Sequence, residues 1–159
     1  MKELQIWEDR KEKKSEYFKE QLREAYEFEK FIDEFFRCEG IELGMFEEKE
    51  CQYKGENIKG IEIKYDKLFR KTGNLYIEFA EKQPNATEWI PSGIEKHGNS
   101  KFLLIGDFNK FWIFNINNLI SLKHRFKNVT TFTSKGYLLP IEEAEKEELN
   151  IKAVIYDLK

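Results

Sequence analysis

The feature that most constrains the fold is a proline-free stretch from about residue 8 to residue 38, dominated by glutamate, lysine, arginine and alanine. These residue types favour helix. Large apolar residues recur along it at spacings of three and four, which is typical of a helix with one face against a core. The members of this stripe are Phe18, Leu22, Ala25, Ile32 and Phe36, and Phe28, Phe31 and Phe35 widen it. The sequence therefore predicts one long helix that ends at Gly40.

One charged residue, Glu29, falls on this stripe between Ala25 and Ile32. A carboxylate among apolar side chains is costly unless it is paired or coordinates a cation. Two interpretations stay open: Glu29 pairs with a lysine or reaches solvent, or it belongs to a functional site.

Two alternating segments follow, at residues 60–66 and 75–80, and each predicts a strand. In the first, Glu62, Lys64 and Asp66 alternate with isoleucines and share one face. The second places a polar row on one face, consisting of Tyr76, Glu78, Ala80 and Lys82. A hairpin across the intervening loop would pair the strands antiparallel. Asp66 and Glu78 would then meet.

Alternating charge on a strand most often marks its solvated face. The other interpretation is a metal site, because two carboxylates beside a lysine suit Mg²⁺, which keeps several waters for nucleophilic work. Glu78 favours the second interpretation, since Tyr76 and Ala80 bracket it on its own face and suggest partial burial.

The rest of the chain predicts a single α/β domain over residues 1–159, with the long helix at about 8–38 and a sheet core at about 41–115. A short strand is expected at 41–46, and two buried strands at 101–107 and 110–116. The C-terminal segment, 116–159, predicts a helix at 117–124, a Ser-Lys-Gly turn at 134–136 beside a strand, an acidic helix after Pro140, and a strand or disorder at 151–156.

Composition excludes several function classes. The net charge is −3, so nucleic-acid binding would depend on local basic patches. No apolar run reaches the length of a membrane span, and the first residues are charged and unlike a signal peptide. The two cysteines have no metal-ligand spacing, which predicts free thiols in a cytoplasmic protein. There is no P-loop or dinucleotide fingerprint.

The order of a helix glutamate, an Asp, and a Glu one strand later resembles the PD-(D/E)xK, restriction-endonuclease-like nuclease superfamily. The pattern E-x-K-x-D…TGN-x-x-x-E at residues 62–78, followed by PSGI at 91–94 and TSKGYLLPI at 133–141, is similar to a group of phage-encoded nucleases of that superfamily. The resemblance spans residues 25–142. It implies a central mixed sheet, a long N-terminal helix and short flanking helices.

The resemblance implies that Asp66, Glu78 and Glu29 hold Mg²⁺ or Mn²⁺, with Glu27 as the rival of Glu29. The superfamily usually has a lysine where this chain has Ala80. Two lysines could replace it: Lys64, which is favoured because its row also holds Asp66, and Lys82.

A metal-dependent deoxyribonuclease is therefore the expected function, and a catalytically degenerate protein of the same fold that binds DNA or a protein is the alternative. A long helix that serves as a protein-interaction module is a third. DNA is the expected partner, and a homodimer would supply two sites for cutting both strands. The residues expected to contact DNA are basic: Lys67, Arg70, Lys71, Lys123, Arg125, Lys127 and Lys135.

Overall fold

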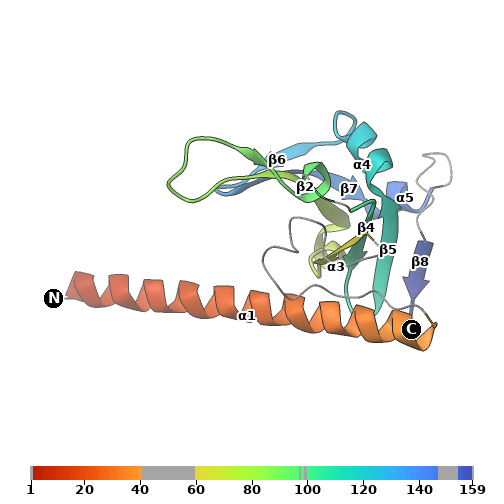
Figure 1. Ribbon diagram of the computed structural model, residues 1–159. Coiled ribbons are helices and arrows are strands. Elements are labelled where there is room, and N and C mark those ends of the chain that lie inside the picture. The colour runs from red at the N-terminus through yellow and green to blue at the C-terminus, as the bar shows by residue number, and fades with distance from the viewer. Residues whose placement is uncertain (1, 41–59, 97, 99, 147–153, 159) are drawn as a thin grey trace.

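One long helix and two four-stranded sheets are stacked in three layers (Figure 1). The computed structural model describes residues 2–40, 60–96, 98, 100–146 and 154–158. The first sheet has the order β1-β4-β5-β8 and comprises Ile61–Tyr65, Phe102–Gly106, Lys110–Asn115 and Val154–Asp157. The second has the order β3-β2-β7-β6 and comprises Ile90–Pro91, Asn74–Glu81, Ser134–Pro140 and Asn128–Thr130. The expected mixed α/β class is confirmed.

The helix α1 runs from Lys2 to Cys38 and begins earlier than expected. It ends where predicted, because Gly40 adopts a positive φ of 78° that suits glycine. Only the C-terminal part of the predicted apolar stripe packs against the core. Its C-terminal members are buried, whereas Phe18 and Leu22 are 61% and 56% exposed. The N-terminal part of α1 projects beyond both sheets (Figure 1), so those side chains meet no core.

The first sheet is covered on both faces. On one face α1 buries Phe28, Ile32 and Phe36 against Ile63, Leu104 and Phe111 of the sheet. On the other face the alternate residues of β4 and β5 pack against β2, β7 and the helix α4 (Ile116–Leu122) in a second core cluster. The central strand β4 is therefore buried on both faces.

The predicted hairpin between residues 60–66 and 75–80 is wrong. The strand β1 pairs in parallel with β4, and β2 pairs with β7 and β3 in the other sheet. The connection contains a short helix, α3 (Phe69–Thr72), whose Phe69 is buried and whose end is closed by Gly73 at a φ of 73°. The chain therefore crosses between layers instead of folding back along β1.

Several other expectations are confirmed. The strands β4 and β5 form an antiparallel pair around Asp107, whose carboxylate accepts from the backbone N–H groups of Asn109 and Lys110. The helix α4 begins one residue before its predicted start, because Asn115 is its N-cap. The short helix α5 (Ile141–Ala144) follows Pro140, and β8 forms at the C-terminus.

One turn was misassigned, because the segment from Ser134 to Gly136 lies within β7. The predicted strand at 41–46 lies outside the described residues. A 3-10 helix, η1 (Gly93–Glu95), packs on β2. No helix of the described ranges combines the length and the apolar character needed to cross a membrane.

Candidate functional site

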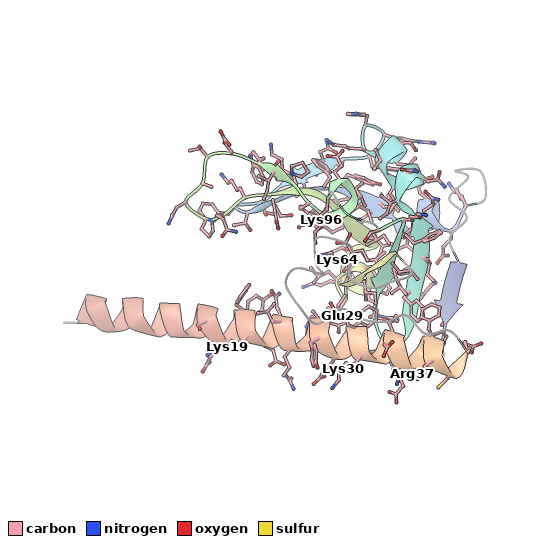
Figure 2. The ribbon with its side chains drawn as sticks, in the orientation of Figure 1. Lys19, Glu29, Lys30, Arg37, Lys64 and Lys96 are labelled. Atoms are coloured by element: carbon pink, nitrogen blue, oxygen red, sulfur yellow. The ribbon has the colours of Figure 1, made fainter. Side chains whose placement is uncertain are left out.

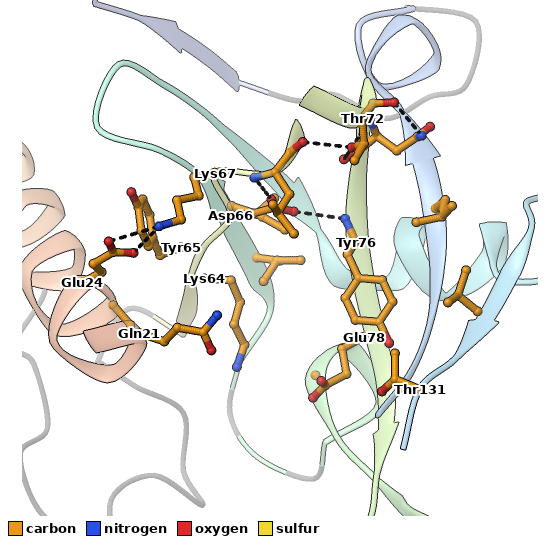
Figure 3. A pocket seen from close by; sticks show the side chains of 18 of the residues that line it. Gln21, Glu24, Lys64, Tyr65, Asp66, Lys67, Thr72, Tyr76, Glu78 and Thr131 are labelled. Atoms are coloured by element: carbon orange, nitrogen blue, oxygen red, sulfur yellow. Dashed lines mark hydrogen bonds and ion pairs between the residues drawn. The ribbon is translucent and has the colours of Figure 1, made fainter. Parts of the chain in front are cut away.

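A cavity of about 580 Å³ is lined by α1, by β1 and β4 of the first sheet, and by β2, β6 and β7 of the second. Figure 3 shows it from close by, with the Lys64 side chain beside Gln21 of α1 and Glu78 on the wall formed by β2. Its polar and charged lining includes Gln21 and Glu24 of α1, Lys64 and Asp66 at β1, and Tyr76 and Glu78 of β2. The strands that were predicted to pair thus face each other across a cavity.

The charged row of β1 points toward the second sheet. The register places Glu62 beside Leu103 and Lys64 beside Ile105, and both of these β4 residues belong to the core between the sheets. Glu62 is only 3% exposed, and its Oε1 lies 3.3 Å from the Nζ of Lys64. Lys64 extends into the space beside α1 (Figure 2). Glu62 is therefore buried, whereas the side chain of Lys64 is 45% exposed and reaches solvent.

Asp66 links the two sheets. One of its carboxylate oxygens accepts from the N–H of Leu68 at 2.9 Å, and the other accepts from the N–H of Tyr76 in β2 at 3.2 Å. Burial raises the pKa of Asp66, against the opposite effect of these N–H donors. The backbone N–H of Phe69 is a third donor that opposes the rise of this pKa.

Glu78 is held by two hydroxyl groups. Ser92 donates to its Oε1 at 2.8 Å, and Ser134 donates to its Oε2 at 2.7 Å. Because the Ser134 hydrogen is used there, the Tyr76 hydroxyl, 2.7 Å away, donates to Ser134. Burial raises the pKa of Tyr76, which keeps its hydroxyl protonated. The sequence analysis placed Tyr76 beside Glu78 but gave neither serine hydroxyl a role there, although both serines lie in the PSGI and TSKGY segments.

Two glycines bring these segments close to Glu78. Gly93 has a φ of 51°, and a Cβ there would collide with the backbone carbonyl of Glu78. A Cβ at Gly136 would lie 2.6 Å from the ring of Tyr76. Glycine is the residue that permits such close backbone approach. The PSGI and TSKGY segments, far apart in sequence, therefore meet on both sides of one carboxylate.

A β-bulge separates Glu78 from Ala80. Glu78 is opposite Gly136 in β7, whereas Ala80 is opposite the adjacent residue, Lys135. Adjacent strand residues point to opposite faces, so Ala80 points away from Glu78 and packs against the core. The expectation that Glu78, Ala80 and Lys82 share a face is wrong. Lys82 does not line the cavity, whereas Lys64 does.

The expected helix glutamates are placed differently. Neither Glu29 nor Glu27 lines the cavity, and the acidic residue that α1 contributes is Glu24. Glu24 forms an ion pair of 2.8 Å with Lys67. The apolar stripe could not identify Glu24. The residue of α1 that lines the cavity depends on where α1 crosses β1, not on its position among apolar residues.

The cavity supplies few side chains that could bind a divalent ion. Among the described residues there is no group of three His, Cys, Asp or Glu side chains arranged to hold a metal. Asp66 and Glu78 supply two hard oxygen ligands in one cavity, and Mg²⁺ commonly uses one or two carboxylates together with waters and substrate phosphates. Asp66 and Glu78 are the ligand types that Mg²⁺ or Mn²⁺ prefers, but the described residues provide no third ligand, so metal binding stays a prediction.

Three of the seven residues expected to contact DNA form ion pairs within the described structure. Lys67 pairs with Glu24, Arg70 pairs with Asp107 through two nitrogens, and Lys123 lies 3.0 Å from Glu95. These carboxylates reduce the local positive charge. The remaining expected contacts do not appear in the described ion pairs: Lys71, Arg125, Lys127 and Lys135.

Comparison of the chain with protein families, with curated proteins and with solved structures finds no match.

Proposed function

We propose that this protein is a divalent-metal-dependent deoxyribonuclease with a restriction-endonuclease-like arrangement. The observation that carries the proposal is the convergence at one cavity of separate segments that resemble the nuclease superfamily. Asp66 and Lys64 come from the first strand, Glu78 from the second, and the PSGI and TSKGY segments supply the hydroxyls that hold Glu78.

Each side chain has a role that its position supports. Asp66 and Glu78 provide oxygen ligands, and Mg²⁺ held there would supply an activated water and neutralise phosphate charge. The ammonium group of Lys64, in the same cavity, would orient the scissile phosphate. Ser92 and Ser134 fix the carboxylate of Glu78, and such supporting hydrogen bonds commonly tune a metal site.

The β-bulge in β2 explains how the site could do without a lysine at position 80. A lysine at position 80 would point away from Glu78, because Ala80 has changed face. A cation at that position would therefore lie outside the cavity. This favours Lys64 over Lys82 as the cation of the site.

The test is cleavage of labelled DNA substrates by the full chain in Mg²⁺ and in Mn²⁺. Glu78→Gln removes a ligand charge with little change of shape, and we expect cleavage to fall by more than about 100-fold, since even supporting residues cost about 10- to 100-fold. Lys64→Gln should also reduce cleavage. The matched control is Glu81→Gln, an exposed carboxylate on the same strand that does not line the cavity.

Cleavage that survives Glu78→Gln unchanged would refute the proposed site. The catalytically degenerate alternative is favoured by one observation, the lack of a three-residue ligand group among the described residues. It would be supported by DNA binding without cleavage in either metal, across duplex, branched and single-stranded substrates. The homodimer remains a prediction.

A further inference from the structure

A cluster of two lysines and two aromatic residues lies at the end of the β2–β7 pair. We call Lys82, Trp89, Phe132 and Lys135 the lysine–aromatic cluster. The Nζ atoms of Lys82 and Lys135 lie 4.9 Å and 4.5 Å from the centroid of the Trp89 ring, and that of Lys82 lies 5.9 Å from the Phe132 ring. Two ammonium groups thus share one indole.

The charges of this cluster are not compensated within the described structure. Neither lysine forms an ion pair with a described carboxylate, although Glu81 and Glu88 are exposed nearby in the sequence. A ring face attracts a cation, and both ammonium groups lie within about 5 Å of the centroid of the Trp89 ring, so two positive charges gather around it. An anion beside this ring would be attracted by both.

Phe132 adds an exposed planar surface beside these charges. Its side chain is 69% exposed, the largest value among the exposed large hydrophobic residues described, and it belongs to neither core cluster. A single exposed apolar residue is ordinary. A planar ring next to two uncompensated ammonium groups, however, matches a ligand that carries both negative charge and flat apolar faces.

We propose that the lysine–aromatic cluster binds unpaired nucleotides of a DNA strand. The ammonium groups would contact phosphates, and Phe132 would stack on a base, which is the combination that proteins use for single strands. A duplex keeps its bases stacked inside and would offer phosphates only. This inference deepens the proposed function, on which it rests, by naming single-stranded or locally unpaired DNA as the substrate class.

The cluster is close to the proposed site along the strands. Lys135 follows Ser134, whose hydroxyl donates to Glu78, and the bulge at residues 78–80 separates the two faces. The loop between β2 and β3 projects to the same side of the molecule as the N-terminal part of α1 (Figure 1). A strand bound at the cluster would therefore be held at the end of the β2–β7 pair that also carries Glu78.

The experiment measures binding without catalysis. Fluorescence anisotropy in metal-free buffer compares a labelled oligothymidylate of about 20 nucleotides with a hairpin duplex of the same charge. We expect the oligothymidylate to bind about 10-fold more tightly, Phe132→Ala to weaken that binding about 10-fold, and Lys82→Gln with Lys135→Gln to reduce the salt dependence. Phe132→Ala should leave the thermal unfolding unchanged, because the ring is outside the core.

The matched control is a second exposed cation–aromatic pair. Lys30 lies 5.0 Å from the ring of Tyr26 on α1, and Tyr26 is 56% exposed. Figure 2 shows Lys30 on the side of α1 turned away from the sheets. Tyr26→Ala with Lys30→Gln should leave oligothymidylate binding unchanged.

Three outcomes would overturn the inference: equal affinity for duplex and single strand, binding insensitive to Phe132→Ala, or displacement by polyglutamate at equal charge, which would indicate an acidic protein segment.

The two proposals can fail separately. Selective binding that depends on Phe132 without any metal-dependent cleavage would leave this inference standing and remove the nuclease. Cleavage that is lost in Glu78→Gln but unaffected by the variants of the lysine–aromatic cluster would support the nuclease and refute this inference.

Discussion

Asp66 and Glu78 are both carboxylates in one cavity, but their hydrogen-bond partners differ in a way that matters. Asp66 accepts from backbone N–H groups, among them those of Leu68 and Tyr76, which can only donate. Glu78 accepts from two serine hydroxyls, which can also rotate and accept. Asp66 thus has a structural role in joining the two sheets beyond any role with metal.

Replacing the carboxylate by an amide should therefore lower the free energy of unfolding by different amounts at the two positions. In Asp66→Asn, the amide NH₂ would face an N–H donor, and we expect a loss of about 1–3 kcal/mol in the free energy of unfolding. In Glu78→Gln, a serine hydroxyl can reorient toward the NH₂, and the loss should stay below about 1 kcal/mol. Urea titration of both variants measures the difference; equal losses would contradict this account.

The raised pKa of Asp66 predicts a pH dependence of stability. Burial raises this pKa, so the folded state binds the proton more tightly than the unfolded state does. The resulting stabilisation is full below the unfolded pKa of about 4 and is lost as pH rises through the higher folded pKa. The free energy of unfolding of the wild type minus that of Asp66→Asn should decrease across this window in metal-free buffer. A difference that increases with pH would show the opposite shift.

At the scale of elements, η1 and the bulge in β2 matter most. The bulge turns Glu78 and Ala80 to opposite faces, and η1 places Ser92 against Glu78. This packing depends on the absence of a side chain at Gly93, because its Cβ would overlap the carbonyl of Glu78.

Gly93→Ala should therefore destabilise the protein by more than about 2 kcal/mol, from the combined cost of overpacking and an unfavourable φ. Gly73→Ala is the matched control, because Gly73 also has a positive φ but its Cβ would meet nothing within 4 Å. That control should cost about 1 kcal/mol. Thermal unfolding followed by circular dichroism distinguishes them, and equal costs would mean that contact with Glu78 is unimportant.

At the scale of the whole molecule, β4 couples the layers. Leu104 packs toward α1, whereas its neighbours Leu103 and Ile105 pack toward the second sheet. A side chain lost on one face of β4 should weaken the packing on both faces. The cavity with Asp66 and Glu78 is lined by α1 and by strands of both sheets, so its geometry depends on all three layers.

Leu104→Ala should lower the free energy of unfolding by about 2–5 kcal/mol, because the residue is fully buried. Helix loss, followed by far-ultraviolet circular dichroism, and loss of packing around Trp112 of β5, followed by fluorescence in a variant with Trp7 and Trp89 replaced by Phe, should remain coincident in urea. Ile120→Ala, at an exposed position of α4, is the control and should change little. Separate transitions would show that α1 unfolds independently of the sheets.

The sequence by itself determined the elements and the candidate residues. Periodicity located α1, β1, β2, β4 and β5, because patterns of 3.6 and two residues reflect local backbone geometry. It also singled out Asp66, Glu78 and Lys64, which do line one cavity.

Only the tertiary structure decided which of these residues meet. The sequence pattern is the same whether a charged strand faces solvent or a second sheet, so pairing of β1 with β4 and burial of Glu62 could not be derived from it. The bulge that turns Ala80 and Lys82 away from Glu78 leaves no trace in an alternating pattern. For a similar reason the sequence pointed to Glu29 of α1, whereas the acidic residue of α1 that lines the cavity is Glu24. A helix face is fixed by periodicity, but the point where it crosses a sheet is fixed by packing between layers.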